Sequence, residues 1–471
     1  MSTGRAPGGP QVGGALAGTD RRSILLVATV ASFLTPFMGS AVNIALPSMG
    51  EELEMDAVLL TWVATAYLLA AAIFLVPFGR LSDLIGRKRV FLWGMVLVTV
   101  LNVFLGLSLS GGMVVVLRFL QGIGAAMIFG TGLALLTAVY PKEQRGFVLG
   151  INVMAVYVGL SLGPAGGGAI TEFLGWRWVF FSIVPMGLLV IAITLWKVKG
   201  DLAGSEGERF DVKGTVLYSM SITLVLVGFS TLPERMGLAL IAAGALTGLL
   251  FVFWGSWVKA PVLDMNLFRR NRVFAYSNLA ALIHYSATFA IAFLLSLYLQ
   301  YIRGMSPAEA GGVILVQPLM MAGFSPFTGR LSDVVEPRLV ASVGMAITTA
   351  GLAAFVFLSP ETDVWLIIWV LVIIGIGYAL FSSPNTNAVM SSVPPKAYGV
   401  ASGTVGTMRL LGQVFSMGIA TVLFAVLIGR QQITPELHEE FMLAVNLAFG
   451  IFAVLGVLGV MASMARGSLR D

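Results

Sequence analysis

The stretch PFGRLSD at residues 77–83 recurs as PFTGRLSD at residues 326–333, so that the shared GRLSD cores lie 250 residues apart. Each copy ends the second long apolar run in a set of six. A second pair of similar segments follows the fourth run of each set, at 141–146 and 394–399. The repeat predicts two parallel six-helix halves. Halves of this kind, related by an axis along the membrane normal, enclose a central site that faces each side in turn.

Composition indicates that these halves lie in a membrane. Of the 471 residues, 58% are hydrophobic and 11% are charged, whereas an ordinary soluble domain carries about 25% charged residues. Continuous apolar runs of about 20 residues are long enough to cross a bilayer as helices. Strands of a membrane barrel would instead show shorter segments of alternating polarity. We therefore expect an all-α polytopic membrane protein.

We predict fourteen spans, in which two linker helices, spans 7 and 8, are inserted between the two six-helix halves. The predicted spans are 22–48, 59–79, 89–108, 113–139, 146–171, 178–196, 214–232, 237–258, 273–301, 308–328, 339–358, 364–391, 399–428 and 441–463. The corresponding division is a disordered cytoplasmic tail at 1–21, an N-terminal half at 22–198, a loop with the linker spans at 199–272, a C-terminal half at 273–463 and a tail at 464–471.

The positions of Lys and Arg set the orientation of the spans. With both termini in the cytoplasm, 22 of the 28 Lys and Arg residues fall in inner segments. Four fall in outer loops, namely Arg177, Arg235, Arg303 and Arg430, and two fall within spans, Arg118 and Arg409. This asymmetry follows the positive-inside rule. We expect a monomer in the plasma membrane, and the charge of +5 gives no reason to expect a nucleic-acid partner.

Several function classes are disfavoured by what the sequence lacks. It contains no cysteine and two histidines, which leaves little for a metal or thiol site, and we expect no cofactor. It has no GxxxxGK[ST] loop for nucleotide phosphates. A GxSxG pattern surrounds Ser161 within a predicted helix, but a nucleophile elbow needs a preceding strand and a positioned histidine. A membrane enzyme is therefore the most remote alternative.

The segment GRLSDLIGRKR at 79–89 resembles the loop between spans 2 and 3 in the major facilitator superfamily, specifically its fourteen-span drug:proton antiporter branch. The resemblance extends over nearly the whole chain. It implies a conformational latch formed by Gly79, Arg80, Asp83, Gly86, Arg87 and Lys88. In the alternative interpretation, the basic residues only keep this loop on the cytoplasmic side of the membrane.

Two further segments resemble motifs of the same family. RFLQG at 118–122 resembles the motif whose arginine faces the transport pathway, and Gln121 shares a helix face with Arg118. Alternatively, Arg118 reaches the membrane boundary as a long flexible side chain. The stretch 159–168 resembles a motif of exporters, and it predicts a hinge and helix seam, or packing alone, at Gly159, Gly163, Pro164 and Gly167.

One departure from the family affects energy coupling. The family commonly has an acid five residues before Asn43, where this chain has Met38. No Asp or Glu residue lies near the middle of a predicted span, so His284 is the remaining titratable candidate deep inside a span. His284 either carries a proton or forms a structural hydrogen bond between helices.

Two arginines and no acid inside the spans favour neutral or anionic amphiphiles as substrates. The predicted pathway residues are Asn43, Tyr67, Arg118, Gln121, Tyr157, His284, Tyr285 and Arg409. The leading functional hypothesis is a secondary active, alternating-access exporter of small amphiphilic compounds that is coupled to protons. The alternative is an uncoupled or anion-coupled facilitator of anionic or lipid-like substrates. The expected partners are the lipid bilayer, a small-molecule substrate and protons.

Overall fold

The structure of the protein is a computed structural model. It describes residues 21–140, 142–199, 210–232, 234–258, 261, 265–393, 398–429 and 431–467. Every regular element in these residues is helical. The tail predicted at 1–21 lies outside them except for its last residue, and the residues after 467 also lie outside them.

The N-terminal half begins with long helices and ends with a broken one. Its helices are α1 (Arg21–Glu52), α2 (Ala57–Ile85), α3 (Arg87–Gly106), α4 (Gly111–Val139), α5 (Lys142–Leu174), α6 (Arg177–Phe181) and α7 (Val184–Lys197). The linker region contains α8 (Val212–Ser230), α9 (Arg235–Gly255) and the short α10 (Met265–Arg270).

The C-terminal half contains more interruptions. Its elements are α11 (Arg272–Thr288), α12 (Ile291–Leu297), the π-helical η1 (Tyr298–Ile302), α13 (Pro307–Ile314), α14 (Val316–Val334), α15 (Pro337–Phe355), α16 (Val364–Ser391), α17 (Tyr398–Leu427), the short η3 (Pro435–Leu437) and α18 (His438–Ala465).

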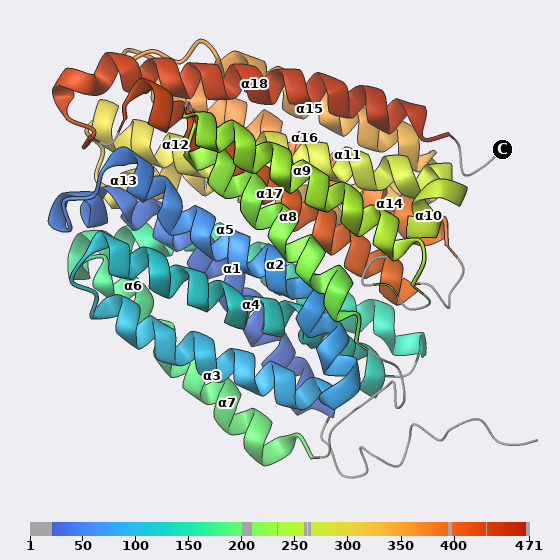
Figure 1. The fold of residues 1–471 in the computed structure, drawn as a ribbon. Coiled ribbons are helices and arrows are strands. Elements are labelled where there is room, and N and C mark those ends of the chain that lie inside the picture. Colours follow the sequence, from blue (N-terminus) through green and yellow to red (C-terminus); the bar gives the residue numbers. More distant parts are fainter. Residues whose placement is uncertain are drawn as a thin grey trace, which may run out of the picture.

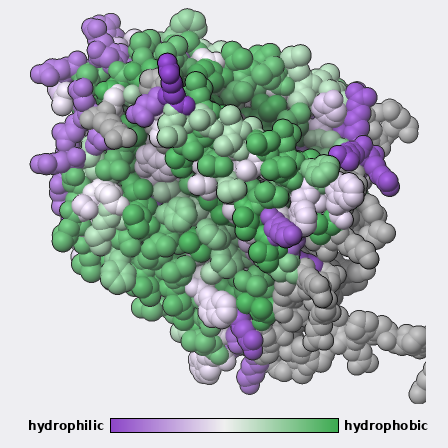
Figure 2. Space-filling view, viewed as in Figure 1, coloured by the Kyte–Doolittle hydropathy of each residue, from purple (hydrophilic) through white to green (hydrophobic). Residues whose placement is uncertain are grey.

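Thirteen helices in the described part of the chain are long and apolar enough to cross a membrane. The predicted span at 146–171 lies in α5, which is not one of the thirteen, so the count of fourteen stays a prediction. Large apolar side chains face outward along the bundle, as at Leu249 and Trp369. Figure 2 shows hydrophobic residues over most of the face between the two ends of the molecule. A surface of this kind is suited to lipid contact.

The same packing pattern occurs in both halves. In the N-terminal half α4 packs on α2 and α3, α1 packs on α5, and α7 packs on α1 and α3. In the C-terminal half α16 packs on α14 and α15, α11 packs on α17, and α18 packs on α11 and α15. The sequence repeat is therefore a structural repeat, as predicted.

Three of the predicted spans are interrupted. Span 9 divides between α11 and α12, where the Ala290 N–H donates to Ser416 Oγ at 3.0 Å. Such side-chain bonds allow a helix to break at membrane depth. Span 10 divides between α13 and α14, because Pro318 has no N–H to donate to the preceding turn. Span 6 divides before α7, which has Pro185 in its first turn.

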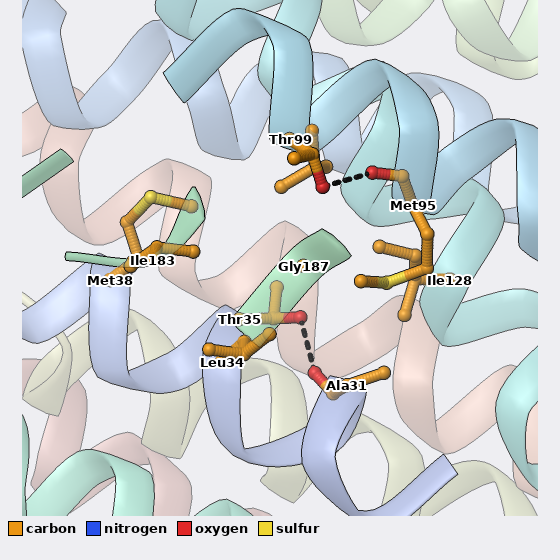
Figure 3. Close-up of a pocket in the computed structure, with 10 residues that line it drawn as sticks. Ala31, Leu34, Thr35, Met38, Met95, Thr99, Ile128, Ile183 and Gly187 are labelled. Carbon is orange, nitrogen blue, oxygen red and sulfur yellow. Dashed lines mark hydrogen bonds between the residues drawn. The ribbon is translucent and has the colours of Figure 1, made fainter. Parts of the chain in front are cut away.

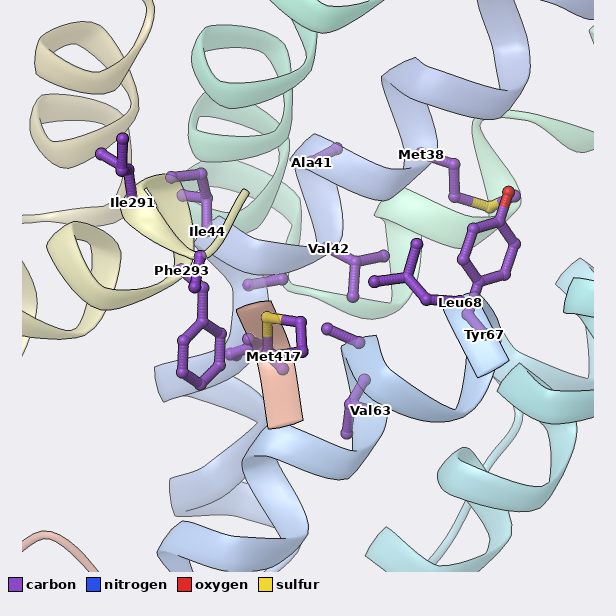
Figure 4. Packing of buried hydrophobic residues seen from close by; sticks show 14 of the residues in the cluster. Met38, Ala41, Val42, Ile44, Val63, Tyr67, Leu68, Ile291, Phe293 and Met417 are labelled. Carbon is purple, nitrogen blue, oxygen red and sulfur yellow. The ribbon is translucent and has the colours of Figure 1, made fainter. Parts of the chain in front are cut away.

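The linker helices α8 and α9 pack against each other between the two halves, and α8 contacts both α2 and α17 (Figure 1). A buried apolar core fills the junction of the halves nearby. Figure 4 shows Met38 and Val42 from α1, Val63 and Leu68 from α2, Phe293 from α12 and Met417 from α17 within this core.

The halves are joined at one end of the bundle, which is opposite the end that carries the described termini (Figure 1). Five hydrogen bonds between described residues cross from one half to the other, and all lie at this end. They join Ser296 to Asn43 O, Gln300 to Ile44 O, Thr421 to Thr61, Ala308 N to Glu172 and Ala57 N to Gln431 O. We call this the closed end.

Candidate functional site

Arg118 lies in the interior of the N-terminal half and is only 1% exposed. Its Nε donates to Val63 O at 3.1 Å, and its Nη1 donates to Gln121 Oε1. The guanidinium carbon lies 4.3 Å from the centroid of the Tyr67 ring, a cation–π distance. Burial and these inward contacts place the charge inside the bundle and away from its surface.

A chain of polar contacts continues from Arg118. Gln121 Nε2 donates to Asn102 Oδ1 and contacts Met38 Sδ, each at 3.1 Å. Asn102 in turn donates to Val98 O. The position at which the family commonly has an acid is thus occupied by a weak sulfur acceptor. No described carboxylate forms an ion pair with Arg118.

The C-terminal half has an aromatic cluster around His284, which is 2% exposed. The His284 ring centroid lies 4.1 Å from that of Phe381, 4.9 Å from that of Tyr378 and 6.0 Å from that of Tyr285. His284 Nε2 is buried and makes no hydrogen bond within the described structure. Tyr157 of α5 packs against the same cluster from the other half.

Arg409 on α17 lies at the edge of this aromatic cluster. Its guanidinium carbon is 5.2 Å from the centroid of the Tyr285 ring. It makes no hydrogen bond or ion pair with any residue that the structure describes. Four of the predicted pathway residues, namely Tyr157, His284, Tyr285 and Arg409, therefore lie close together.

The other four pathway residues lie in the N-terminal half. Tyr67, Arg118 and Gln121 form the contacts given above. Asn43 is 5% exposed, and its backbone oxygen accepts from Ser296 Oγ at 2.9 Å, so it belongs to the closed end. Its side-chain Oδ1 has no hydrogen-bond partner among the described residues.

The loop motif at 79–89 forms the turn between α2 and α3. Gly86 has φ 114° and ψ 129°, a conformation open to glycine but strained for other residues. Its N–H donates to Ser82 O at 3.0 Å. Lys88 donates to Val198 O, which ties the start of α3 to the residue after α7. The side chain of Asp83 lies outside the described atoms.

Glycines of α5 form a close contact with α1. A Cβ at Gly159 would lie 2.4 Å from Phe33 O, one at Gly163 would lie 2.8 Å from Phe37 O, and one at Gly167 would lie 2.7 Å from Ala41 Cα. Side chains larger than hydrogen would force the two helices apart. Pro164 lies within α5, and its carbonyl oxygen approaches Gly311 of α13.

A small cavity of about 10 Å³ lies beside Met38 within the N-terminal half (Figure 3). That volume suits about one water molecule. The hydroxyls of Thr35 and Thr99 at its wall donate to carbonyls of their own helices, Ala31 O and Met95 O. The cavity is too small for a substrate.

Three residues near these sites were not predicted from the sequence. Tyr378 and Phe381 of α16 complete the aromatic cluster, and aromatic residues in an apolar span give no distinctive signal. Arg466 was assigned to the C-terminal tail, but it is 1% exposed. It bonds Ser277 and Asn385 at 3.2 and 3.0 Å. In the described residues no group of three His, Asp or Glu side chains is placed to hold a metal.

Comparison with known proteins identifies the family. The model of the Major Facilitator Superfamily matches residues 28–417 and, in a second match, 277–466. The chain is 31% identical over 455 residues to the cephamycin export protein CmcT of Amycolatopsis lactamdurans, covering 94% of this chain and 93% of that protein. It is 27% identical over 431 residues to the riboflavin transporter RibZ of Clostridioides difficile, covering 91% and 94%.

A solved structure has the same overall fold. The bacterial homologue of the human lysosomal transporter Spinster, in an inward-facing and unoccupied conformation, superimposes with a TM-score of 0.70. The match covers 95% of this chain and 96% of that chain at 16% identity. Together with the two matched halves and the repeated packing, these similarities show that the chain belongs to the Major Facilitator Superfamily and is a membrane transporter.

Proposed function

We propose that this transporter is a secondary active exporter of small amphiphilic compounds, and that its preferred substrates are neutral or anionic. The observation that carries the proposal is the pair of guanidinium groups at Arg118, which is buried, and Arg409, which is partly buried, one in each half. Each lies beside a tyrosine ring, and neither pairs with a described carboxylate. Uncompensated positive charge in an apolar bundle attracts an anion or the acceptor groups of a neutral amphiphile.

Transport would proceed by alternating access of the two halves. If the termini are cytoplasmic, the closed end is external, and the described conformation faces the cytoplasm. A substrate entering from the cytoplasm would reach Arg409 and the aromatic cluster between the halves. The motif at 79–89 would act as a latch in the opposite conformation, in which Asp83 pairs with neighbouring helix ends. Asp83→Asn would then lower transport more than expression, since it removes the charge and keeps the shape.

Protons would couple to transport through His284. Its ring lies among Phe381, Tyr378 and Tyr285, and its Nε2 has no partner in the described residues. A charged imidazolium in such surroundings needs a counter-charge. An anionic substrate supplies that charge, which links proton binding to substrate binding. The alternative, an uncoupled or anion-coupled facilitator, is favoured by the absence of an acid at Met38.

Flux into proteoliposomes tests these proposals. Three fluorescent amphiphiles that share one ring system and carry a negative, neutral or positive group would be compared with and without a pH gradient. We expect accumulation of the negative and neutral compounds that requires the gradient. Preference for the cation would overturn the substrate proposal, and gradient-independent flux would select the facilitator. Chemical conversion of a compound by the purified protein would support the enzyme alternative.

The orientation can be tested separately. The chain has no cysteine, so each introduced cysteine is unique. We propose that Arg87→Cys reacts with an impermeant maleimide only in inverted vesicles, and that Glu439→Cys reacts in intact cells. The reverse labelling pattern would mean that the closed end lies in the cytoplasm and that the described conformation faces outward.

A further inference from the structure

A second cavity lies between the linker helices α8 and α9 and one face of α17. Its volume is about 340 Å³. The lining residues are mainly apolar, and they include Val225 of α8, Phe251 and Val252 of α9, and Met408 and Leu411 of α17. None of the eight predicted pathway residues lines it. The cavity is therefore separate from these residues, although Met408 of its wall also packs against the aromatic cluster.

One hydroxyl in this cavity has no partner. Thr407 is 2% exposed, and its Oγ1 makes no hydrogen bond within the described structure. The other two hydroxyl residues of the lining are paired, because Ser221 donates to Gly244 O at 2.8 Å and Tyr218 donates to Ala72 O at 2.9 Å. A buried unpaired donor is unfavourable unless a ligand satisfies it. Thr407 thus indicates an occupant that carries a hydrogen-bond acceptor.

The surroundings of the cavity define the rest of that occupant. All three helices that line it are candidate membrane spans. Leu249 and Phe253 on the adjoining surface of α9 are 68% and 62% exposed, so this surface faces hydrocarbon in a bilayer. Pockets for small molecules measure about 300–1,000 Å³. The cavity is at the lower end of that range and suits one chain, not an entire lipid molecule.

We propose that this cavity binds one acyl chain of a membrane phospholipid, with the ester carbonyl of that chain accepting a hydrogen bond from Thr407 Oγ1. The chain fills the apolar space, and the carbonyl satisfies the buried hydroxyl. The location is also the junction of the halves. Tyr218, which lines the cavity, bonds α2 of the N-terminal half, whereas Thr407 belongs to the C-terminal half.

Photocrosslinking in nanodiscs tests this assignment. The bilayer would contain phosphatidylethanolamine and phosphatidylglycerol, with a small fraction of phosphatidylethanolamine bearing a diazirine near the ester of one acyl chain. We expect saturable labelling of α17 at 407–415 in the full-length protein. Val252→Trp fills the cavity from its open side and should reduce this labelling about tenfold. Leu249→Trp, one turn away on the exposed surface, is the matched control and should leave it unchanged.

A second variant tests the hydrogen bond. Thr407→Val keeps the shape of the wall and removes the donor, so labelling should fall about threefold, a smaller loss than that for Val252→Trp. Size-exclusion profiles and thermal unfolding would verify that both variants fold. Wild-type labelling that never saturates, or that is equal with Leu249→Trp and Val252→Trp, would overturn the proposal. Stronger saturable labelling by a single-chain diazirine amphiphile without an ester would also overturn it. None of these readouts depends on transport.

Discussion

Arg118 in the N-terminal half is held by a carbonyl, an amide and an aromatic ring, whereas Arg409 in the C-terminal half lies against one ring and makes no described hydrogen bond. Gln121 extends the first network, and His284 leaves the second with another unpaired nitrogen. A satisfied polar network is rigid, while unpaired donors favour a ligand that can satisfy them. From this comparison we propose that the N-terminal half presents a preformed charge and that the C-terminal half responds to substrate.

Substituting lysine at both arginines gives the largest expected difference between the halves. A single ammonium cannot reproduce the two hydrogen bonds and the ring contact of Arg118. We expect Arg118→Lys to lower the initial transport rate about hundredfold and Arg409→Lys about threefold. Rates in proteoliposomes, normalised to monodisperse protein, would measure both. Equal losses would remove the distinction between a preformed and a responsive site.

Removing the titratable ring tests the C-terminal cluster. In His284→Gln, the side chain can still form hydrogen bonds but can no longer be protonated, so stimulation by a pH gradient should fall about tenfold while downhill exchange continues. His438→Gln at the start of α18 is the matched control, since it changes the other histidine of the chain. If the pH gradient stimulates His284→Gln as strongly as the wild type, the proton binds elsewhere, at a carboxylate at the end of a helix.

Introducing an acid tests the N-terminal network. In Met38→Glu, a carboxylate would accept from Gln121 in place of sulfur and would partly neutralise Arg118. The ratio of cationic to anionic substrate transport should rise about fivefold. Met38→Leu controls for the loss of the thioether. A ratio that is the same in both variants would mean that substrate does not sense the charge of Arg118.

The smallest effect is expected at the closed end. Thr421→Val keeps the side-chain volume but removes the hydrogen bond to Thr61, which is worth about 1 kcal/mol. The closed end should open more often, and disulfide formation between cysteines introduced at Ala57 and Gln431 should slow about threefold. Thr247→Val, whose hydroxyl bonds only within α9, should have no effect. If both variants slow disulfide formation equally, the effect is a general loss of stability and does not come from the hydrogen bond between Thr421 and Thr61.

The helical architecture was readable from the sequence because apolar runs of membrane length and the repeated GRLSD core are strong signals. The breaks between α11 and α12 and between α13 and α14 were not predicted. The first depends on a side chain from another helix, Ser416, and a distant contact leaves no local pattern. Pro318 was visible in the sequence, but proline occurs within several continuous helices here, including α1 and α5.

The charged and titratable residues of the candidate site give the strongest signal in the sequence. Arg118, Arg409 and His284 are conspicuous in apolar spans, and their positions inside the bundle, buried at Arg118 and His284 and partly buried at Arg409, follow from the cost of placing charge in lipid. Tyr378 and Phe381 resemble ordinary packing residues in the sequence, so their position around His284 is seen only in the structure. The sequence also gives no sign that the Thr407 hydroxyl lacks a hydrogen-bond partner, because this depends on which groups surround it in the folded protein.

The burial of Arg466 bears on how the protein is synthesised. Its guanidinium bonds Ser277 of α11, Asn385 of α16 and Ser463 of α18. These contacts can form only after residue 466 has been synthesised and has left the ribosome. In the N-terminal half, the contact between Tyr140 and Arg21 O joins segments that are made early. The N-terminal half can therefore begin to pack while the C-terminal half is still being synthesised.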